Sequence, residues 1–186
     1  MDHNKFKMII FDWDGTLYAS SFFESFDKAN KNVSNNFASH FAKIYDIYFN
    51  FHKPKLVNGA KEVLSKLRKN SIIVLYSNTR EYRLRKELDY LKIKNLFDYV
   101  ITGSGYNAYK PDGSVIIEIM KQSNIKSNEV LIVGNSLNDY NLAKNIGAKI
   151  CITHEITNYN FDKVDYYITN FYELLNVVQW KIIIRL

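Results

Sequence analysis

Cysteine is almost absent from this sequence. Only Cys151 occurs among the 186 residues, so no intramolecular disulfide can form. Its neighbours Ile150 and Ile152 are apolar, which predicts that the thiol packs in the core as a small hydrophobic group. The sequence therefore excludes a scaffold held by disulfides and favours a reducing, intracellular compartment.

Long apolar runs, repeats and low-complexity segments are also missing. No apolar run is long enough to span a bilayer, and the polar start at residues 1–5 does not resemble a signal peptide. With 47% hydrophobic and 24% charged residues, the composition is typical of a globular chain, and the length fits one domain with a small insertion. We expect a soluble, cytoplasmic protein with no membrane partner.

A net charge of +6 and a pI near 9.2 favour anionic partners in general, but the lysines are scattered along the whole chain. No nucleic-acid-binding module is recognisable, so nucleic acid is not expected as a partner. One denser basic run comprises Arg80, Arg83, Arg85 and Lys86. It could form a rim that attracts phosphorylated substrates, or the solvent-exposed face of a helix in which Glu81, Glu87 and Asp89 are interspersed. We favour the exposed helix face, with Arg80 as the exception.

The most informative stretch is a short apolar run that stops at acidic residues. Residues 8–11 are apolar at consecutive positions, which indicates a strand buried on both faces, as in a parallel sheet. Asp12, Asp14 and Gly15 follow directly, where ligands bind in such sheets, beyond the carboxyl end of the strand. Taken alone, the same residues could form an ordinary turn.

Three further stretches carry polar residues that could lie close to Asp12 and Asp14 in the folded chain. The run at 72–76 ends in Ser77-Asn78-Thr79, the run at 130–133 ends in Gly134-Asn135-Ser136-Leu137-Asn138-Asp139, and Tyr109-Lys110-Pro111-Asp112-Gly113 lies between them. In this order, the four stretches resemble the four signature motifs of the haloacid dehalogenase superfamily of phosphohydrolases, in its phosphoglycolate-phosphatase-like form with a short cap. The first, Asp12-Trp13-Asp14-Gly15-Thr16-Leu17, is the most specific, and the resemblance spans roughly residues 6 to 153.

Strand-like and helix-like segments alternate along the chain, which predicts an α/β fold: a Rossmann-like, doubly wound parallel sheet. Helices are expected at 80–91, 114–122, 138–145 and 172–178, and further strands at 99–101, 149–152 and 166–168. Gly147 should end the third of these helices, and a loop should carry Gly103, Gly105 and Lys110. The apolar tail at 180–186 could be an added edge strand or a contact with another subunit, and the oligomeric state stays open.

The resemblance places a cap insertion after the first strand. We expect a catalytic core formed by residues 1–18 and 53–186 and a short helical cap at 19–52, made of two helices joined around residues 30–34, with Ser34-Asn35-Asn36 as the N-cap of the second helix. The aromatic residues of the cap could stack on a flat substrate or could pack the cap against itself and the core. Packing is favoured, because an isolated helical pair must bury its apolar stripe.

The resemblance also assigns catalytic roles. Asp12 would be the nucleophile that forms an aspartyl-phosphate, and Asp14 would protonate the leaving oxygen and then take a proton from the attacking water. Trp13 should point the opposite way in an extended chain and pack in the core. Thr16, Ser77, Asn78 and Lys110 would bind the transferred phosphoryl group, with Lys110 counted as catalytic because it offsets repulsion between phosphate and carboxylates. Alternatives are a strand-end cap for Ser77 and a solvated loop lysine for Lys110.

Magnesium is the cofactor that this arrangement implies, held by Asp12, the main-chain carbonyl of Asp14, Asn135 and Asp139. Many relatives have an aspartate where Asn135 stands, so Asp139 is the more probable acidic contact, unless it serves only as a charge at a helix N-terminus. Two hypotheses result. The first is a magnesium-dependent phosphomonoester hydrolase for a small phosphorylated metabolite, and the second is a weak or inactive relative that binds a phosphorylated ligand or partner.

Overall fold

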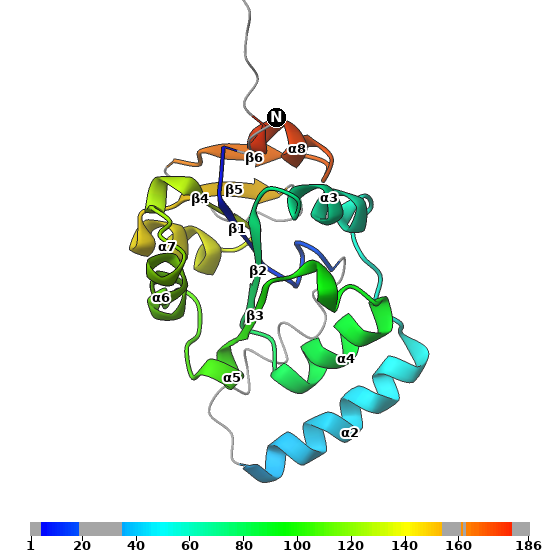
Figure 1. Ribbon diagram of the computed structural model, residues 1–186. Helices are drawn as coiled ribbons and strands as arrows, with labels where there is room; N and C mark the ends of the chain where they lie inside the picture. Colours follow the sequence, from blue (N-terminus) through cyan, green and yellow to red (C-terminus); the bar gives the residue numbers. More distant parts are fainter. Residues whose placement is uncertain (1–4, 19–34, 154–160, 162, 180–186) are drawn as a thin grey trace, which may run out of the picture.

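A six-stranded parallel sheet forms the centre of the protein. The computed structural model describes residues 5–18, 35–153, 161 and 163–179, and the strand order is β3-β2-β1-β4-β5-β6 (Figure 1). The strands are β1 (Met8–Phe11), β2 (Ile72–Ser77), β3 (Tyr99–Thr102), β4 (Val130–Gly134), β5 (Lys149–Thr153) and β6 (Tyr166–Ile168). The predicted doubly wound α/β fold is confirmed.

Strand β1 lies at the middle of the sheet and is buried along its whole length. It pairs in parallel with β2 on one side and with β4 on the other, so that Met8 is opposite both Ile72 and Val130. Because successive side chains of a strand point to opposite faces, Ile9 and Phe11 enter one core cluster and Met8 and Ile10 the other. The unbroken apolar run is thus explained by cores on both faces.

Helices cover both faces of the sheet (Figure 1). Side chains of α3 (Ala60–Leu67), α4 (Glu81–Leu91) and α8 (Glu173–Val178) join the cluster that contains Phe11. Those of α6 (Ser114–Gln122) and α7 (Leu137–Ile146) join the cluster on the opposite face. This layering leaves the carboxyl ends of the strands free to present polar residues.

Most predicted elements lie within a residue or two of their expected bounds. Gly147 ends α7 in the left-handed conformation, with φ of 69°. The expected loop after β3 is partly wrong, because residues 103–106 form the short helix α5 (Gly103–Tyr106). The Thr102 hydroxyl accepts a hydrogen bond from Gly105 N (3.0 Å) and so caps this turn of helix. Two 3-10 turns, η1 (Lys94–Leu96) and η2 (Ser127–Glu129), complete the connections.

Helix α2 (Asn35–Phe51) packs against α4 through aromatic side chains (Figure 1). Phe41, Tyr45 and Phe49 are buried together, and the Phe49 ring meets Tyr90 of α4 edge-on at 5.4 Å between ring centroids. These aromatics therefore pack against the core, as favoured. The first predicted cap helix, the tail at 180–186 and Ser34 of the N-cap predicted for α2 lie outside the described residues, and the division into core and cap stays a prediction.

The single cysteine of the chain lies in the core. Cys151 is fully buried, and burial raises the pKa of its thiol to about 12, so it packs as an apolar residue.

Over the ranges that the structure describes, no helix combines the length and apolarity needed to cross a membrane.

The packing of α2 gives a stability prediction. Phe49→Ala should lower the free energy of unfolding by about 3 kcal/mol, because it opens a cavity beneath a helix that docks through few large side chains. Phe51→Ala on the same helix is the matched control: Phe51 is 80% exposed, and its loss should change stability by less than about 0.5 kcal/mol. Urea unfolding followed by circular dichroism measures both, and equal effects would contradict this account of α2.

Candidate active site

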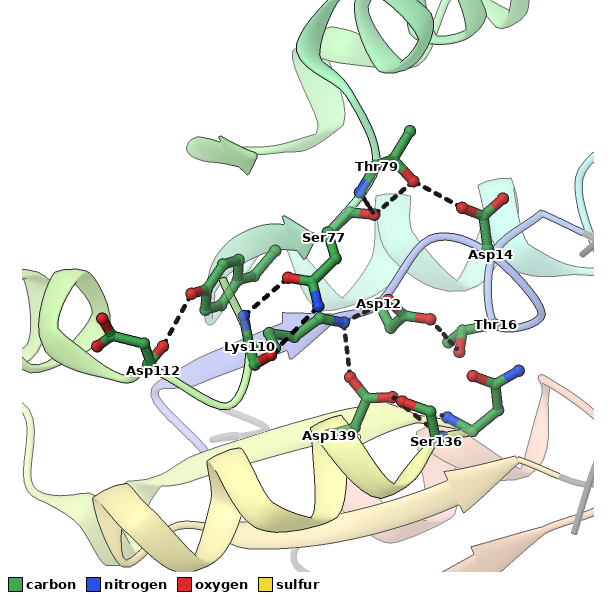
Figure 2. A network of polar contacts seen from close by, with 12 residues as sticks. Asp12, Asp14, Thr16, Ser77, Thr79, Lys110, Asp112, Ser136 and Asp139 are labelled. Atoms are coloured by element: carbon green, nitrogen blue, oxygen red, sulfur yellow. Dashed lines mark hydrogen bonds and ion pairs between the residues drawn. The ribbon is translucent and has the colours of Figure 1, made fainter. Parts of the chain in front are cut away.

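The polar ends of β1, β2 and β4 lie side by side at one edge of the sheet (Figure 2). Asp12 follows β1 and donates its backbone N–H to Val133 O (2.9 Å), which fixes it beside the end of β4. Ser77 ends β2, and Asn135 follows β4. In this strand order the crossover direction reverses at β1 and β4, which is where ligands bind in open α/β sheets.

Lys110 lies between two carboxylates and is itself buried (Figure 2). Its ammonium group donates to Asp12 Oδ1 and to Asp139 Oδ1, the latter at 2.7 Å. The alternative of a solvated loop lysine is wrong, because Lys110 is only 5% exposed. The structure thus brings together Asp12, Lys110 and Asp139 as a buried ion cluster.

The charges of this cluster depend strongly on one another. Burial raises the pKa of Asp12 to about 7; the Lys110 ammonium opposes this shift and the Asp139 carboxylate adds to it. For Lys110, burial disfavours the charged form, but the two carboxylates outweigh it and raise the pKa of the ammonium group above its ordinary value. Lys110 is therefore a permanent cation next to a carboxylate that is costly to ionise.

Asn78 and Tyr76 hold the loop that carries Lys110. The side chain of Asn78 accepts from Lys110 N (2.7 Å) and donates to Lys110 O (3.2 Å). The Tyr76 hydroxyl donates to Asp112 O (2.8 Å), beyond the cis Lys110–Pro111 peptide bond. Asn78 is thus placed by its own bonds on the lysine loop, and its predicted contact with phosphate stays a prediction.

Asp14 points away from the ion cluster (Figure 2). Gly15 turns the chain after it with φ of +78°, and the Thr16 hydroxyl reaches back to Asp12 Oδ2 (3.2 Å). Asp14 Oδ2 accepts from the Thr79 hydroxyl (2.6 Å), which in turn accepts from the Ser77 hydroxyl (2.9 Å). Thr16 therefore adjoins Asp12, whereas Ser77 reaches Asp14 through Thr79.

Two charged residues of α4 contradict the expectation of a solvent-exposed helix face. Arg83 is fully buried and Glu87 is 1% exposed, on the same face as the core residues Leu84 and Leu88. The Arg83 guanidinium binds Asp14 Oδ1 and, through Nε, Glu87 Oε1 (3.1 Å). A signal for this was available: residues 83, 84, 87 and 88 share one helix face, so the charges that alternate with leucines could have been recognised as internal.

The remaining charges of that run behave as expected of a surface. Arg85 pairs with Glu81 one turn earlier on the exposed side of α4. Arg80, the expected exception, stands at the N-terminus of α4 with its guanidinium 5.0 Å from the centroid of the Phe41 ring.

Trp13 packs in the core as predicted and donates Nε1–H to Glu87 Oε2 (2.6 Å).

Asp139 and Asn135 are the fourth-motif residues. Asp139 Oδ2 accepts from the Ser136 hydroxyl (2.6 Å), Ser136 N (3.0 Å) and Asn135 N (3.3 Å), while its other oxygen binds Lys110. Asp139 thus completes a capping box at the start of α7. Neither polar atom of the buried Asn135 side chain has a hydrogen-bond partner within the described residues. Its amide oxygen could therefore serve as a metal ligand beside the loop that carries Asp12.

The acidic side chains are not gathered as a preformed metal cage. No group of three or more acidic, histidine or cysteine side chains within the described ranges is placed to hold a metal ion. The reason is that Lys110 engages Asp12 and Asp139, and Arg83 engages Asp14. The predicted metal ligands Asp12, Asp14, Asn135 and Asp139 stay a prediction.

Comparison with known proteins identifies the family. The family model for haloacid dehalogenase-like hydrolases matches residues 19–153, which include Ser77, Lys110, Asn135 and Asp139. The chain belongs to this family. The predicted superfamily is confirmed.

Individual relatives agree with the assignment. A phosphoglycolate phosphatase from Pseudomonas fluorescens is 33% identical over 92 residues, which cover 49% of this chain and 34% of that enzyme. The match thus spans about a third of the relative's length. Among solved structures, a predicted phosphoglycolate phosphatase from Haemophilus somnus superposes with a TM-score of 0.74 at 20% identity, covering 93% of this chain and 98% of that one. YfnB from Bacillus subtilis superposes at 0.69 and 15% identity, covering 92% and 98%, so both support the fold.

The buried ion cluster gives a second prediction. Lys110→Met should lower the free energy of unfolding by about 3–5 kcal/mol, because Asp12 and Asp139 would lose the cation buried between them. Lys149→Met is the matched control, since Lys149 pairs with Asp165 at 2.7 Å but its side chain is 46% exposed; its loss should cost less than about 1 kcal/mol. Chemical denaturation compares the two variants. If Lys110→Met lowers the free energy of unfolding as little as Lys149→Met does, the cluster does not stabilise the fold.

Proposed function

We propose that the protein is a magnesium-dependent phosphomonoester hydrolase that acts through an aspartyl-phosphate on a small phosphorylated metabolite. The observation that carries the proposal is the position of Asp12: it follows the central strand and is paired with a buried, permanently charged lysine. A carboxylate backed by fixed positive charge is what nucleophilic attack on a phosphate dianion requires, because the cation reduces the repulsion between the two anions.

The proposed reaction has two steps. In the first, an oxygen of Asp12 attacks phosphorus, the bond to the leaving oxygen breaks, and Asp14 gives that oxygen its proton. In the second, Asp14 takes a proton from water, the water oxygen attacks phosphorus, and inorganic phosphate leaves with Asp12 restored. Thr16 would hold the second oxygen of Asp12, to which its hydroxyl lies at 3.2 Å. Ser77 and Asn78 would complete the phosphate site by resemblance to the family motifs.

The residues present fit a magnesium ion held by few protein ligands. Magnesium takes oxygen ligands, keeps several waters and is usually bound by one or two carboxylates together with substrate phosphate. Asp12, the main-chain carbonyl of Asp14 and the buried, unpartnered Asn135 oxygen would hold it, with Asp139 directly or through water. When bound, the ion would neutralise charge on the phosphoryl oxygens. YfnB was crystallised bound to magnesium, which supports this choice of cofactor.

The names of the relatives support a small phosphorylated acid as substrate. The matched Pseudomonas fluorescens protein is a phosphoglycolate phosphatase, although the match covers only a third of it. A second candidate function is binding of a phosphorylated ligand with little or no turnover. Asn135 favours it, because an amide in place of a carboxylate supplies a ligand oxygen without charge.

A nucleophile test addresses the proposal directly. Asp12→Asn should reduce phosphate release by at least about a thousandfold, since an amide oxygen is a poor nucleophile, while circular dichroism stays unchanged. A screen of phosphomonoesters that includes phosphoglycolate, run with and without magnesium, supplies the assay. Asp112→Asn, which removes an exposed carboxylate two residues after Lys110, is the matched control and should keep full activity. Normal turnover by Asp12→Asn would refute the mechanism.

Asn135 separates the two candidate functions. Asn135→Asp should lower the magnesium concentration needed for half-maximal activity by about tenfold, because it adds a formal charge next to a strongly hydrated cation. Activity at saturating magnesium should change little. A wild type without turnover that becomes active on this substitution would instead identify a binding protein descended from an enzyme, and an unchanged magnesium dependence would exclude residue 135 as a ligand.

A further inference from the structure

A chain of buried polar side chains links helix α2 to Asp14. It runs from Tyr45 of α2 to Glu87 and Arg83 of α4 and ends at Asp14. We refer to these four residues as the α2–Asp14 relay. Tyr45 and Glu87 are each 1% exposed, Arg83 is fully buried and Asp14 is 3% exposed. Each link therefore acts where water does not screen it.

At its inner end, the relay fixes the orientation of Asp14. Oδ1 binds the Arg83 guanidinium and Oδ2 accepts from the Thr79 hydroxyl (2.6 Å), so both oxygens have partners on the side of α4 and β2. A carboxyl group free to rotate about its side-chain torsions would present its oxygens in many directions. Held at both oxygens, Asp14 keeps one orientation.

At its middle, Glu87 fixes Arg83. Glu87 Oε1 accepts from the Tyr45 hydroxyl (2.7 Å) and Arg83 Nε (3.1 Å), and Oε2 accepts from Trp13 Nε1 (2.6 Å). A buried carboxylate with three donors has little freedom to move, and a guanidinium held through Nε can aim its terminal nitrogens in only one direction. Because Trp13 adjoins Asp14 in the chain, the same glutamate anchors the catalytic loop twice.

We infer that Arg83 is a positioning residue for Asp14 and that Tyr45, through Glu87, makes this positioning depend on the docking of α2. The inference rests on the proposed function, in which Asp14 protonates the leaving oxygen. It assigns a role to buried charges that the catalytic proposal does not use. The outer helix then contributes to catalysis without contacting the substrate.

The leaving group provides a readout that a purely structural role would not move. An alkyl ester such as glycerol 1-phosphate needs a well-aimed acid, because its alkoxide is a poor leaving group. In 4-nitrophenyl phosphate the leaving phenolate is stable and needs little protonation. Loss of positioning should therefore lower kcat/KM, which reports only the steps up to release of the leaving group, far more for the first ester than for the second, whereas general damage lowers both equally.

The first variants address Arg83. Arg83→Lys keeps the charge but loses the forked geometry, and should lower kcat/KM for glycerol 1-phosphate by about 30-fold with less than about threefold loss for 4-nitrophenyl phosphate. Arg85→Lys on the exposed side of α4 is the matched control and should change neither. Equal losses on both esters, or no loss, would overturn the inference.

A milder variant keeps the test decisive if Arg83→Lys does not fold. Tyr45→Phe removes one hydroxyl and should lower kcat/KM for glycerol 1-phosphate by about threefold to tenfold, with kcat/KM for 4-nitrophenyl phosphate unaffected. Tyr82→Phe is its control, because the Tyr82 hydroxyl also links α4 to α2, through Asp46 (2.7 Å), but on the exposed side and outside the relay. Equal effects of the two would refute a role for Tyr45. A wild type inactive on both esters with magnesium would instead refute the proposed function itself.

Discussion

The site depends on the two ion pairs that the buried ammonium group of Lys110 makes with Asp12 and Asp139. The carboxylates of Asp12, after β1, and Asp139, in the first turn of α7, would repel each other in a buried site that screens charge poorly, and the lysine offsets this repulsion. The main chain of its loop is held by Tyr76 of β2 and by Asn78 directly after β2. The lysine charge thus joins the end of β1 to the start of α7, and the main chain of its loop joins both to β2.

The position of that charge also explains why the acidic residues do not form a metal cage by themselves. Asp12 and Asp139 point at the lysine, Asp14 points at Arg83, and the buried amide of Asn135 is left without a hydrogen-bond partner among the described residues. Each of the three carboxylates thus has a cation beside it within the protein.

Sequence reasoning recovered what depends on local pattern. The consecutive apolar residues 8–11 favoured a doubly buried strand, and the resemblance to the family motifs then predicted that Asp12, Lys110 and Asp139 meet at one edge of a parallel sheet. It missed Arg83 and Glu87, because charged residues in a helix with many charges are usually solvated; their place on the same helix face as Leu84 and Leu88 was the signal that they are internal. It also missed α5, whose helical turn depends on a cap from Thr102 that composition does not reveal.

The pairing of β1 has a consequence for how the chain is made. Its partner on one side, β4, begins at Val130, so most of the domain is synthesised between Met8 and its partner. The central strand therefore leaves the ribosome well before residues 130–134 and lacks its β4 partner until they emerge, with apolar side chains for both cores exposed in the meantime. Closing so long a loop is entropically costly, and sheets built from distant strands form slowly. Nascent chains that end before β4 should consequently be the species most in need of chaperones.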